Sequence, residues 1–198
     1  MIKLIIFDIG GVVIDFTERQ YINYITKKLR LNSKRFSREL IPLINKMELG
    51  AMTLDELENK MSKSFKIKKG SLEWDSSLKE LAKENKSVKN LINNLSRKYV
   101  VVLLSNVSRS RYIVIVNEFL KNIKVNRTFA SCYIKMRKPD VKIYRYVLKT
   151  MKVKSNEAIF IDNLKENTDG AKRIGIKSIQ FKNYKQLKRD LSALKIRM

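Results

Sequence analysis

Apolar residues concentrate in four short stretches of the chain. These stretches are Ile2–Phe7, Tyr99–Leu104, Ala158–Ile161 and Ile176–Phe181. A strand of a parallel sheet is buried on both faces, so it shows a nearly continuous apolar run instead of a strict alternation with polar residues. We therefore expect these four stretches to be the strands of a parallel core sheet.

Helical periodicity separates the four stretches. Apolar residues in these segments recur three and four positions apart, which is the spacing of one helix face. The positions are Val88, Leu91, Ile92 and Leu95; Ile143, Val147 and Leu148 after Pro139; Ala171 and Ile174 before a C-cap glycine, Gly175; and Leu187, Leu191 and Leu194. Strands that alternate with helices predict an α/β fold with a doubly wound parallel sheet.

Residues 17–85 interrupt this alternation and show helical spacing only. The predicted helices cover Tyr21–Leu29, Phe36–Met47 and Leu54–Ser64. Thr53 and Glu56 form a capping-box pattern, in which each side chain binds a main-chain N–H at a helix start. We predict a core of residues 1–16 plus 86–198 and an inserted helical cap at 17–85, which would cover the strand ends as a lid.

Composition narrows the class of protein. The chain has 198 residues, of which 44% are apolar, enough for one packed core with a modest insertion. No apolar run approaches the ~20 residues that cross a bilayer, and the single cysteine, Cys132, cannot form an intramolecular disulfide. We expect a cytoplasmic protein with no membrane partner. The absence of histidine excludes His-based catalytic triads and His metal sites.

The charge is strongly positive, with 43 Lys and Arg against 19 Asp and Glu, a net charge of +24. Such a charge attracts polyanions, including nucleic acid, and speeds the capture of phosphorylated substrates. The basic residues are scattered along the whole chain, however, with no arginine-rich run and no nucleic-acid-binding module. Nucleic acid is therefore an alternative partner that the charge allows but the pattern does not favour.

Polar side chains with complementary chemistry follow the predicted strands. Asp8 follows the first, Ser105 and Asn106 the second and Asp162 the third, while Lys138 precedes a predicted helix. The carboxyl ends of parallel strands open into one crevice, so these side chains would meet there. A carboxylate can attack phosphorus, two carboxylates and a carbonyl suit Mg²⁺, and a hydroxyl with an ammonium can hold phosphoryl oxygens. The pattern indicates phosphoryl transfer.

The same residues lie in four motifs whose order and spacing resemble the haloacid dehalogenase superfamily of phosphotransferases, in its group with a helical cap after the first strand. The motifs are FDIGGVV with Asp8, LLSN with Ser105, MRKPDVKIY with Lys138 and FIDNLKENTDGAKRIGI with Asp162. The stretch ELGAMT, which begins at Glu48, and the MRKPD stretch are especially similar to small bacterial sugar-phosphate phosphatases, including the glucose-1-phosphatase type.

The resemblance implies a Mg²⁺-dependent phosphatase that works through an aspartyl-phosphate. Its expected substrate is a small phosphorylated metabolite, a sugar phosphate by similarity, and the cap would set which one. Asp8 would be the nucleophile and a Mg²⁺ ligand, with the Gly10 main-chain carbonyl and Asp162 as further ligands.

The resemblance also implies how the phosphate is held. Ser105 and Lys138 would bind the transferring phosphate, and Asn106 would lie beside them, facing the substrate or the loop after the first strand. Either a monomer or a homodimer is compatible with these expectations.

Two positions depart from the family pattern. Most phosphatases of the family carry Asp two residues after the nucleophile, where it protonates the leaving oxygen and then activates water, but here that position is Gly10. Because such proton transfer contributes ~10²–10⁴-fold, turnover should be lower or another acid should serve, with Asp15 and Glu48 as candidates. Asn163 stands where a second acidic residue is frequent, and Glu166 would supply the missing outer carboxylate.

Two alternative functions remain open at this point. In a 2-haloacid dehalogenase the same aspartate attacks carbon and needs no metal, although dehalogenases of this scaffold usually have an aromatic residue at the place of Gly10. A weakly active or non-catalytic binding protein is favoured by Gly10 and the charge of +24. The four intact motif residues Asp8, Ser105, Lys138 and Asp162 disfavour that second alternative.

Overall fold

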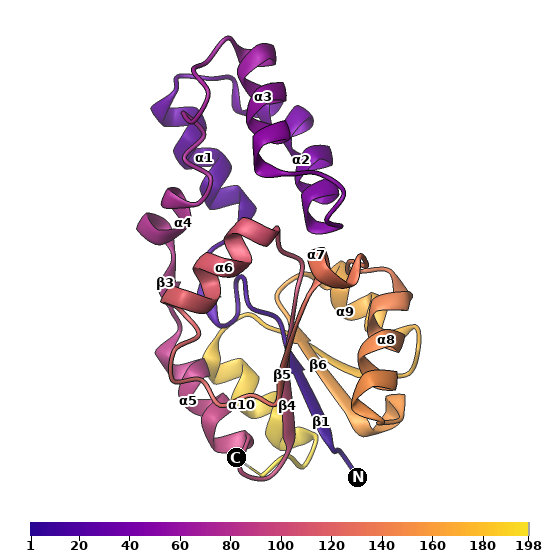
Figure 1. Ribbon diagram of the computed structural model, residues 1–198. Coiled ribbons are helices and arrows are strands. Elements are labelled where there is room, and N and C mark those ends of the chain that lie inside the picture. The colour runs from indigo at the N-terminus through magenta and orange to yellow at the C-terminus, as the bar shows by residue number, and fades with distance from the viewer. Residues whose placement is uncertain (198) are drawn as a thin grey trace.

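The computed structural model describes residues 1–197 and contains a parallel five-stranded sheet (Figure 1). The strand order is β5-β4-β1-β6-β7. The strands are Leu4–Phe7 (β1), Val100–Ser105 (β4), Arg127–Ala130 (β5), Ala158–Asp162 (β6) and Lys177–Gln180 (β7). β1 lies in the middle of the sheet, because Leu4 is in register with Val100 on one side and with Ala158 on the other.

Helices cover both faces of this sheet. Ile5 and Phe7 of β1 share an apolar cluster with residues of α5 (Lys86–Leu95) and α10 (Tyr184–Ala193). Leu4 and Ile6 point to the other face, where α8 (Val141–Met151) and α9 (Lys165–Lys172) pack. All four side chains of β1 are fully buried, which explains the unbroken apolar run. The predicted α/β fold with a doubly wound parallel sheet is confirmed.

The sheet has one strand more than the four that the sequence predicted. The additional strand β5 lies at the sheet edge and has the sequence RTFA, in which only Phe129 and Ala130 are buried. Two helices flank it, α6 (Arg109–Glu118) before and α7 (Ser131–Ile134) after, and a 3₁₀ turn, η1 (Ser155–Glu157), precedes β6. A short, half-exposed edge strand lacks the apolar run on which the prediction depended.

A helical unit follows β1 and stands beyond the carboxyl ends of the sheet (Figure 1). Its helices are α1 (Glu18–Lys28), α2 (Ser33–Glu48), α3 (Leu54–Phe65) and α4 (Ser76–Leu81). The expected capping box is present at the start of α3, where Thr53 N donates to Glu56 Oε2 at 2.7 Å and Glu56 N donates to Thr53 Oγ1 at 3.2 Å.

A short strand pair joins the two chain segments that connect this unit to the sheet. β2 (Ile14–Asp15) pairs antiparallel with β3 (Lys83–Glu84), with Ile14 opposite Glu84. The expectation that residues 17–85 contain helices only is therefore wrong at β3. Two exposed residues are too few to show any periodicity in a sequence.

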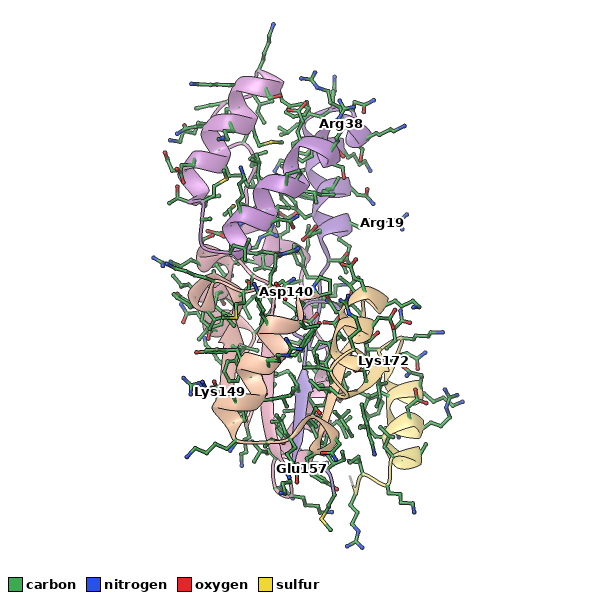
Figure 2. The ribbon with its side chains drawn as sticks, turned by 90° about the vertical axis from the view of Figure 1, so that its right-hand side faces the viewer. Arg19, Arg38, Asp140, Lys149, Glu157 and Lys172 are labelled. Atoms are coloured by element: carbon green, nitrogen blue, oxygen red, sulfur yellow. The ribbon has the colours of Figure 1, made fainter. Side chains whose placement is uncertain are left out.

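Basic side chains project from the surface over the whole length of the molecule. Figure 2 shows Arg19 and Arg38 on the helical unit and Lys149 and Lys172 on helices beside the sheet. No helix within residues 1–197 has both the length and the apolar character that crossing a membrane requires.

Candidate active site

Asp8 lies at the carboxyl end of the central strand. Its main-chain N–H donates to Ile161 O at 2.9 Å, which continues the pairing of β1 with β6 by one residue. The side chain is 6% exposed, and its Oδ1 accepts from Ile9 N at 2.7 Å and from the Lys138 ammonium at 2.8 Å. Both contacts involve Oδ1, and no hydrogen bond or ion pair among residues 1–197 involves Oδ2. One carboxylate oxygen is fixed and the other is available.

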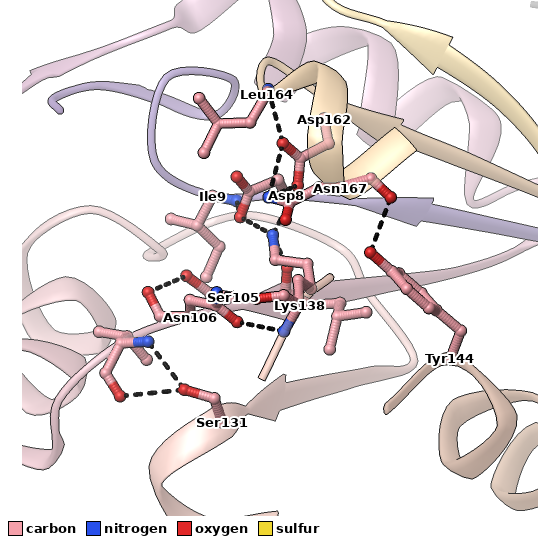
Figure 3. A network of polar contacts seen from close by, with 12 residues as sticks. Asp8, Ile9, Ser105, Asn106, Ser131, Lys138, Tyr144, Asp162, Leu164 and Asn167 are labelled. Atoms are coloured by element: carbon pink, nitrogen blue, oxygen red, sulfur yellow. Dashed lines mark hydrogen bonds and ion pairs between the residues drawn. The ribbon is translucent and has the colours of Figure 1, made fainter. Parts of the chain in front are cut away.

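Lys138 joins the two aspartates predicted for this site (Figure 3). Its Nζ lies 2.8 Å from Asp8 Oδ1 and 2.6 Å from Asp162 Oδ2, and it also donates to Leu104 O at 3.1 Å. The side chain is 1% exposed, so this cation is removed from solvent. The next peptide bond, Lys138–Pro139, is cis.

Asn106 fixes the main chain of Lys138. Its Nδ2 donates to Lys138 O at 2.9 Å, and its Oδ1 accepts from Lys138 N at 2.8 Å. The amide was predicted to face the substrate or the loop after the first strand. Its hydrogen bonds go to the main chain of Lys138, and Asn106 also lines the cavity described below. Ser105, at the end of β4, is 4% exposed, and the one hydrogen bond that its hydroxyl donates to a described residue is long, 3.4 Å from Oγ to Asn106 O.

Asp162 is fully buried at the end of β6. Its Oδ1 accepts from Leu164 N at 2.8 Å, and its Oδ2 accepts from Asn167 Nδ2 at 3.0 Å and from Lys138. The other end of this amide, Asn167 Oδ1, is buried without a hydrogen-bond partner among residues 1–197. Sequence reasoning missed Asn167 and chose the neighbouring Glu166; the signal that could have found it is its place on the first turns of α9, five residues after Asp162.

The electrostatics of these three groups favour an added cation. Burial raises the pKa of Asp8 to about 7; repulsion by Asp162 adds to this effect, and Lys138 opposes it. Burial lowers the pKa of Lys138, but Asp162 and Asp8 outweigh that effect, so its pKa is raised and it stays an ammonium. Two carboxylates against one ammonium leave a buried negative charge, which a divalent cation would offset.

The donor chemistry fits Mg²⁺. Asp8 and Asp162 both lie within hydrogen-bonding distance of the same Lys138 nitrogen, so their carboxylates are close neighbours. Gly10 lines the same cavity as Asp8, and the unpartnered Asn167 Oδ1 offers a further acceptor for a water molecule on the ion. Carboxylate, carbonyl and amide oxygens are hard ligands of the kind that Mg²⁺ prefers.

A cavity of about 550 Å³ separates the strand ends from the helical unit. The sheet side contributes Asp8, Gly10, Ser105, Asn106 and Lys138, together with Asn163, Glu166 and Asn167. The helical unit contributes Glu18 and Arg19 of α1, Ile44 and Glu48 of α2, Trp74 and Leu78. Asp15, one of the two candidate acids, is exposed; its carboxylate accepts from Gln20 Nε2 at 3.3 Å, and it does not line this cavity.

The other candidate acid, Glu48, is buried in the cavity wall. Its Oε2 accepts from Arg137 Nη2 at 2.8 Å and from Arg137 Nε at 3.1 Å, which connects α2 to the loop that carries Lys138. Burial raises the pKa of Glu48 to about 7, and the charge of Glu18 adds to this effect, while Arg137 and Lys138 oppose it.

Arg111 and Trp74 form a part of the wall that sequence reasoning missed. The Arg111 guanidinium stacks 3.4 Å from the Trp74 ring centroid, and its Nε and Nη2 donate to Trp74 O at 3.2 and 3.1 Å. Burial lowers the pKa of Arg111 to about 10. The two residues are 37 positions apart in the chain, so no local sequence pattern predicts this contact. The contact connects α6 to the segment before α4.

Known proteins are similar to this chain in sequence and in architecture. A family model described as haloacid dehalogenase-like hydrolase matches residues 5–181. The drimenol cyclase of Aspergillus calidoustus is 24% identical over 205 residues, which covers 97% of this chain but 36% of the cyclase. The chain thus spans about a third of the length of that curated relative.

Solved structures have the same fold. A haloacid dehalogenase family enzyme of Bacteroides thetaiotaomicron, in complex with magnesium and inorganic phosphate, has a TM-score of 0.79 and 23% identity, covering 92% of this chain and 95% of that one. An L-2-haloacid dehalogenase has a TM-score of 0.64 and 14% identity, covering 90% of this chain and 83% of that one. From the family model, the four motifs in order and the shared fold, we conclude that the chain belongs to the haloacid dehalogenase-like hydrolase family.

Proposed function

We propose that this hydrolase is a Mg²⁺-dependent phosphatase that acts on a small phosphorylated metabolite through an aspartyl-phosphate. The observation that carries the proposal is the arrangement of Asp8: Ile9 N and Lys138 hold Oδ1, while Oδ2 has no partner among the described residues. A nucleophile needs one oriented oxygen with a free lone pair, and this geometry provides it.

Each remaining residue has a role in this proposal. Asp8 Oδ2 attacks the phosphorus, and the Ser105 hydroxyl and the Lys138 ammonium hold the charged equatorial oxygens. Asp8, the Gly10 carbonyl and Asp162 would hold Mg²⁺, which neutralises phosphate charge when bound. The magnesium and phosphate bound by the structurally similar Bacteroides enzyme support this assignment.

We also propose separate roles for the two parts of the chain. Residues 1–16 plus 86–198 would form the catalytic core, and the helical cap at 17–85 would select the substrate, because α1 and α2 supply cavity-lining side chains. A sugar phosphate is the proposed substrate class, and a cytoplasmic location stays a prediction from the cysteine content.

The test is a panel of phosphorylated metabolites assayed with Mg²⁺, comparing wild type with Asp8→Asn. Release of phosphate by the wild type and not by the variant supports the proposal. Asn removes the attacking charge at nearly constant shape, so a folded variant that keeps its activity would contradict the assignment of Asp8.

A dehalogenase is the second candidate, because the fold resembles that of an L-2-haloacid dehalogenase. Asp8 would then attack carbon and displace halide. This reaction requires no metal ion. Assays with a 2-haloacid and with a phosphate monoester, each in excess chelator, separate the two candidates. Halide release that persists in chelator favours the dehalogenase, whereas phosphate release that requires Mg²⁺ favours the phosphatase.

A further inference from the structure

The proposed phosphatase needs an acid for the leaving oxygen, and Gly10 does not supply one. In phosphoryl transfer the attacking and leaving oxygens lie roughly in line on opposite sides of phosphorus. Asp8 attacks from the carboxyl end of β1, so the leaving oxygen points away from the sheet and toward the helical unit across the cavity. An acid for that oxygen must therefore come from the helical side.

Two carboxylates of the helical unit line this cavity, Glu18 of α1 and Glu48 of α2. Asp15 is excluded, since it is exposed and does not line the cavity. Glu166 does line it, but from α9 beside Asp162, on the sheet side. The choice therefore lies between Glu18 and Glu48.

Glu48 is the one that the structure holds in place. It is 5% exposed, and both hydrogen bonds from Arg137 go to Oε2. No hydrogen bond or ion pair among residues 1–197 involves Oε1. Arg137 directly precedes Lys138, whose ammonium binds Asp8, so this oriented carboxylate is tied to the loop that holds the proposed nucleophile. Glu18 makes no side-chain hydrogen bond or ion pair with any described residue.

The surroundings of Glu48 suit proton exchange near neutral pH. Its charged and titratable neighbours are Glu18 on α1, Arg111 on α6, Cys132 on α7, and Arg137 and Lys138 on the following loop. Burial and Glu18 raise the pKa of Glu48 to about 7 against the opposing effect of the cations. A general acid–base group works best with a pKa close to the operating pH.

We propose that Glu48 is the general acid and base that replaces the missing carboxylate at position 10. This proposal rests on the proposed phosphatase function. In the first step Asp8 Oδ2 bonds to phosphorus, the bond to the leaving oxygen breaks, and the proton on Glu48 Oε1 passes to that oxygen to give the free alcohol. In the second step water bonds to phosphorus, the bond from Asp8 breaks, and a proton of that water returns to Glu48.

Arg137 is the positioning residue in this arrangement. It fixes Oε2 through two hydrogen bonds and leaves Oε1 without a hydrogen bond or ion pair among residues 1–197. If the Glu48–Arg137 pair were only a structural contact between α2 and the core, a Glu48 variant would slow all substrates alike. An acid role makes a different prediction, because it depends on the basicity of the leaving oxygen.

The experiment compares wild type, Glu48→Gln and the matched variant Glu18→Gln, all loaded with Mg²⁺. Rapid-quench kinetics are measured with p-nitrophenyl phosphate, whose leaving oxygen needs no proton, and with an alkyl phosphate, whose leaving oxygen does. Asp8→Asn serves as the inactive reference, and thermal melting checks that each variant is folded.

Glu48→Gln is expected to lower kcat on the alkyl phosphate by ~10²-fold or more, within the range of general acid catalysis. With p-nitrophenyl phosphate it should still release about one equivalent of p-nitrophenol in a fast burst, followed by slow turnover, because only the water step lacks its base. Glu18→Gln should give no burst with p-nitrophenyl phosphate, but it removes a charge that raises the pKa of Glu48 and should therefore shift the pH dependence of the alkyl phosphate rate to lower pH. The wild-type rate on the alkyl phosphate should fall as pH rises through about 7, and this fall should disappear in Glu48→Gln.

Several outcomes would overturn the proposal. These are unchanged alkyl turnover in Glu48→Gln, an equal slowing of the burst and the alkyl reaction, or the expected pattern in Glu18→Gln instead. If Glu48→Gln does not fold, a wild-type alkyl rate that stays flat across pH 6–8 still contradicts the acid role. A wild type that hydrolyses neither ester contradicts the phosphatase function itself, which distinguishes that failure from a failure of Glu48 alone.

Discussion

Asn106 clamps the main chain of Lys138 with both ends of its amide, through Nδ2 to Lys138 O at 2.9 Å and Oδ1 to Lys138 N at 2.8 Å. The two residues are 32 positions apart in the chain. This pairing fixes the start of the side chain whose ammonium binds Asp8 and Asp162. The position of the buried cation therefore depends on an amide at the end of β4.

Asn106→Ala is expected to lower phosphatase kcat by ~10–100-fold, the size typical of lost outer contacts that orient a catalytic group. The variant leaves Lys138 in place but frees its main chain. Steady-state kinetics with Mg²⁺ measure the effect, and Asn106→Asp, which keeps the acceptor for Lys138 N, should lose less activity. An Asn106→Ala protein with wild-type kcat would contradict the clamp.

Asp8→Asn is expected to abolish phosphatase activity and leave the fold intact. The substitution keeps the size of the side chain but removes the attacking charge and a proposed Mg²⁺ ligand. Phosphate release and circular dichroism are measured on the same preparation. More than about a tenth of the wild-type rate in a folded sample would remove Asp8 as nucleophile.

Mg²⁺ is expected to be required and Ca²⁺ to inhibit. Mg²⁺ keeps a strict octahedral shell, whereas Ca²⁺ takes more oxygens at longer distances and would bind Asp8 through both oxygens. Oδ2 would then no longer be free to attack. Activity is measured after chelation and after readdition of each ion, and undiminished activity in excess chelator would speak against the phosphatase.

Gly10→Asp is expected to restore alkyl phosphate hydrolysis to Glu48→Gln by at least ~10-fold, a part of the ~10²–10⁴-fold effect of a general acid. Gly10 is not in the left-handed region, and an added Cβ would meet Phe16 O at 3.3 Å, a tight but adjustable contact. The ratio of alkyl to p-nitrophenyl phosphate rates in the double variant is the measurement.

Gly11→Asp is the matched control for this rescue. Gly11 has φ +75°, and a Cβ there would collide with the Asn163 side chain, so this neighbouring substitution should lower the melting temperature without any rescue. Equal melting temperatures for the two glycine variants would show that the loop is less constrained than its backbone indicates.

The stability of metal-free Glu48→Gln is expected to depend less on pH than that of the wild type. The folded pKa of Glu48 is about 7 against an ordinary 4.5, so the folded protein keeps a proton that the unfolded chain has lost within this window. The free energy of unfolding therefore falls as pH rises from 4.5 to 7, by at most ~1.4 kcal/mol per pH unit for this group. Urea denaturation at pH 5 and pH 8 measures the difference. Parallel behaviour of the two proteins would contradict the raised pKa.

The core of the fold could be predicted from sequence because its signals are local. The four predicted strands were found. β1, β4 and β6 are buried apolar runs, whereas β7 has the sequence KSIQ, in which only Ile179 is buried. Gly175 has the positive φ of 83° that its place after a helix predicted. β5 was missed because edge exposure breaks its apolar run, and β2 and β3 because two residues carry no period.

Only the site residues that lie in the four sequence motifs could be predicted. Asp8, Ser105, Lys138 and Asp162 come together as the strand order requires, although their chemical roles stay predictions. The cavity wall could not be predicted, since contacts such as Arg137 with Glu48 join residues 89 positions apart. Such contacts depend on the position of the helical unit relative to the sheet, and no local sequence pattern predicts that position.

The central place of β1 also dictates an order of events during synthesis. Residues 4–7 leave the ribosome before their partners in the sheet, which are residues 100–103 and 158–161. At ~5–20 residues per second, the middle strand waits on the order of ten seconds for its second neighbour. Within residues 18–81, α1 contacts α2 and α4, and α2 contacts α3, so these contacts can form meanwhile. A chain cut short before residue 158 leaves one edge of its most apolar strand open to other chains, so truncated products of this protein are expected to aggregate.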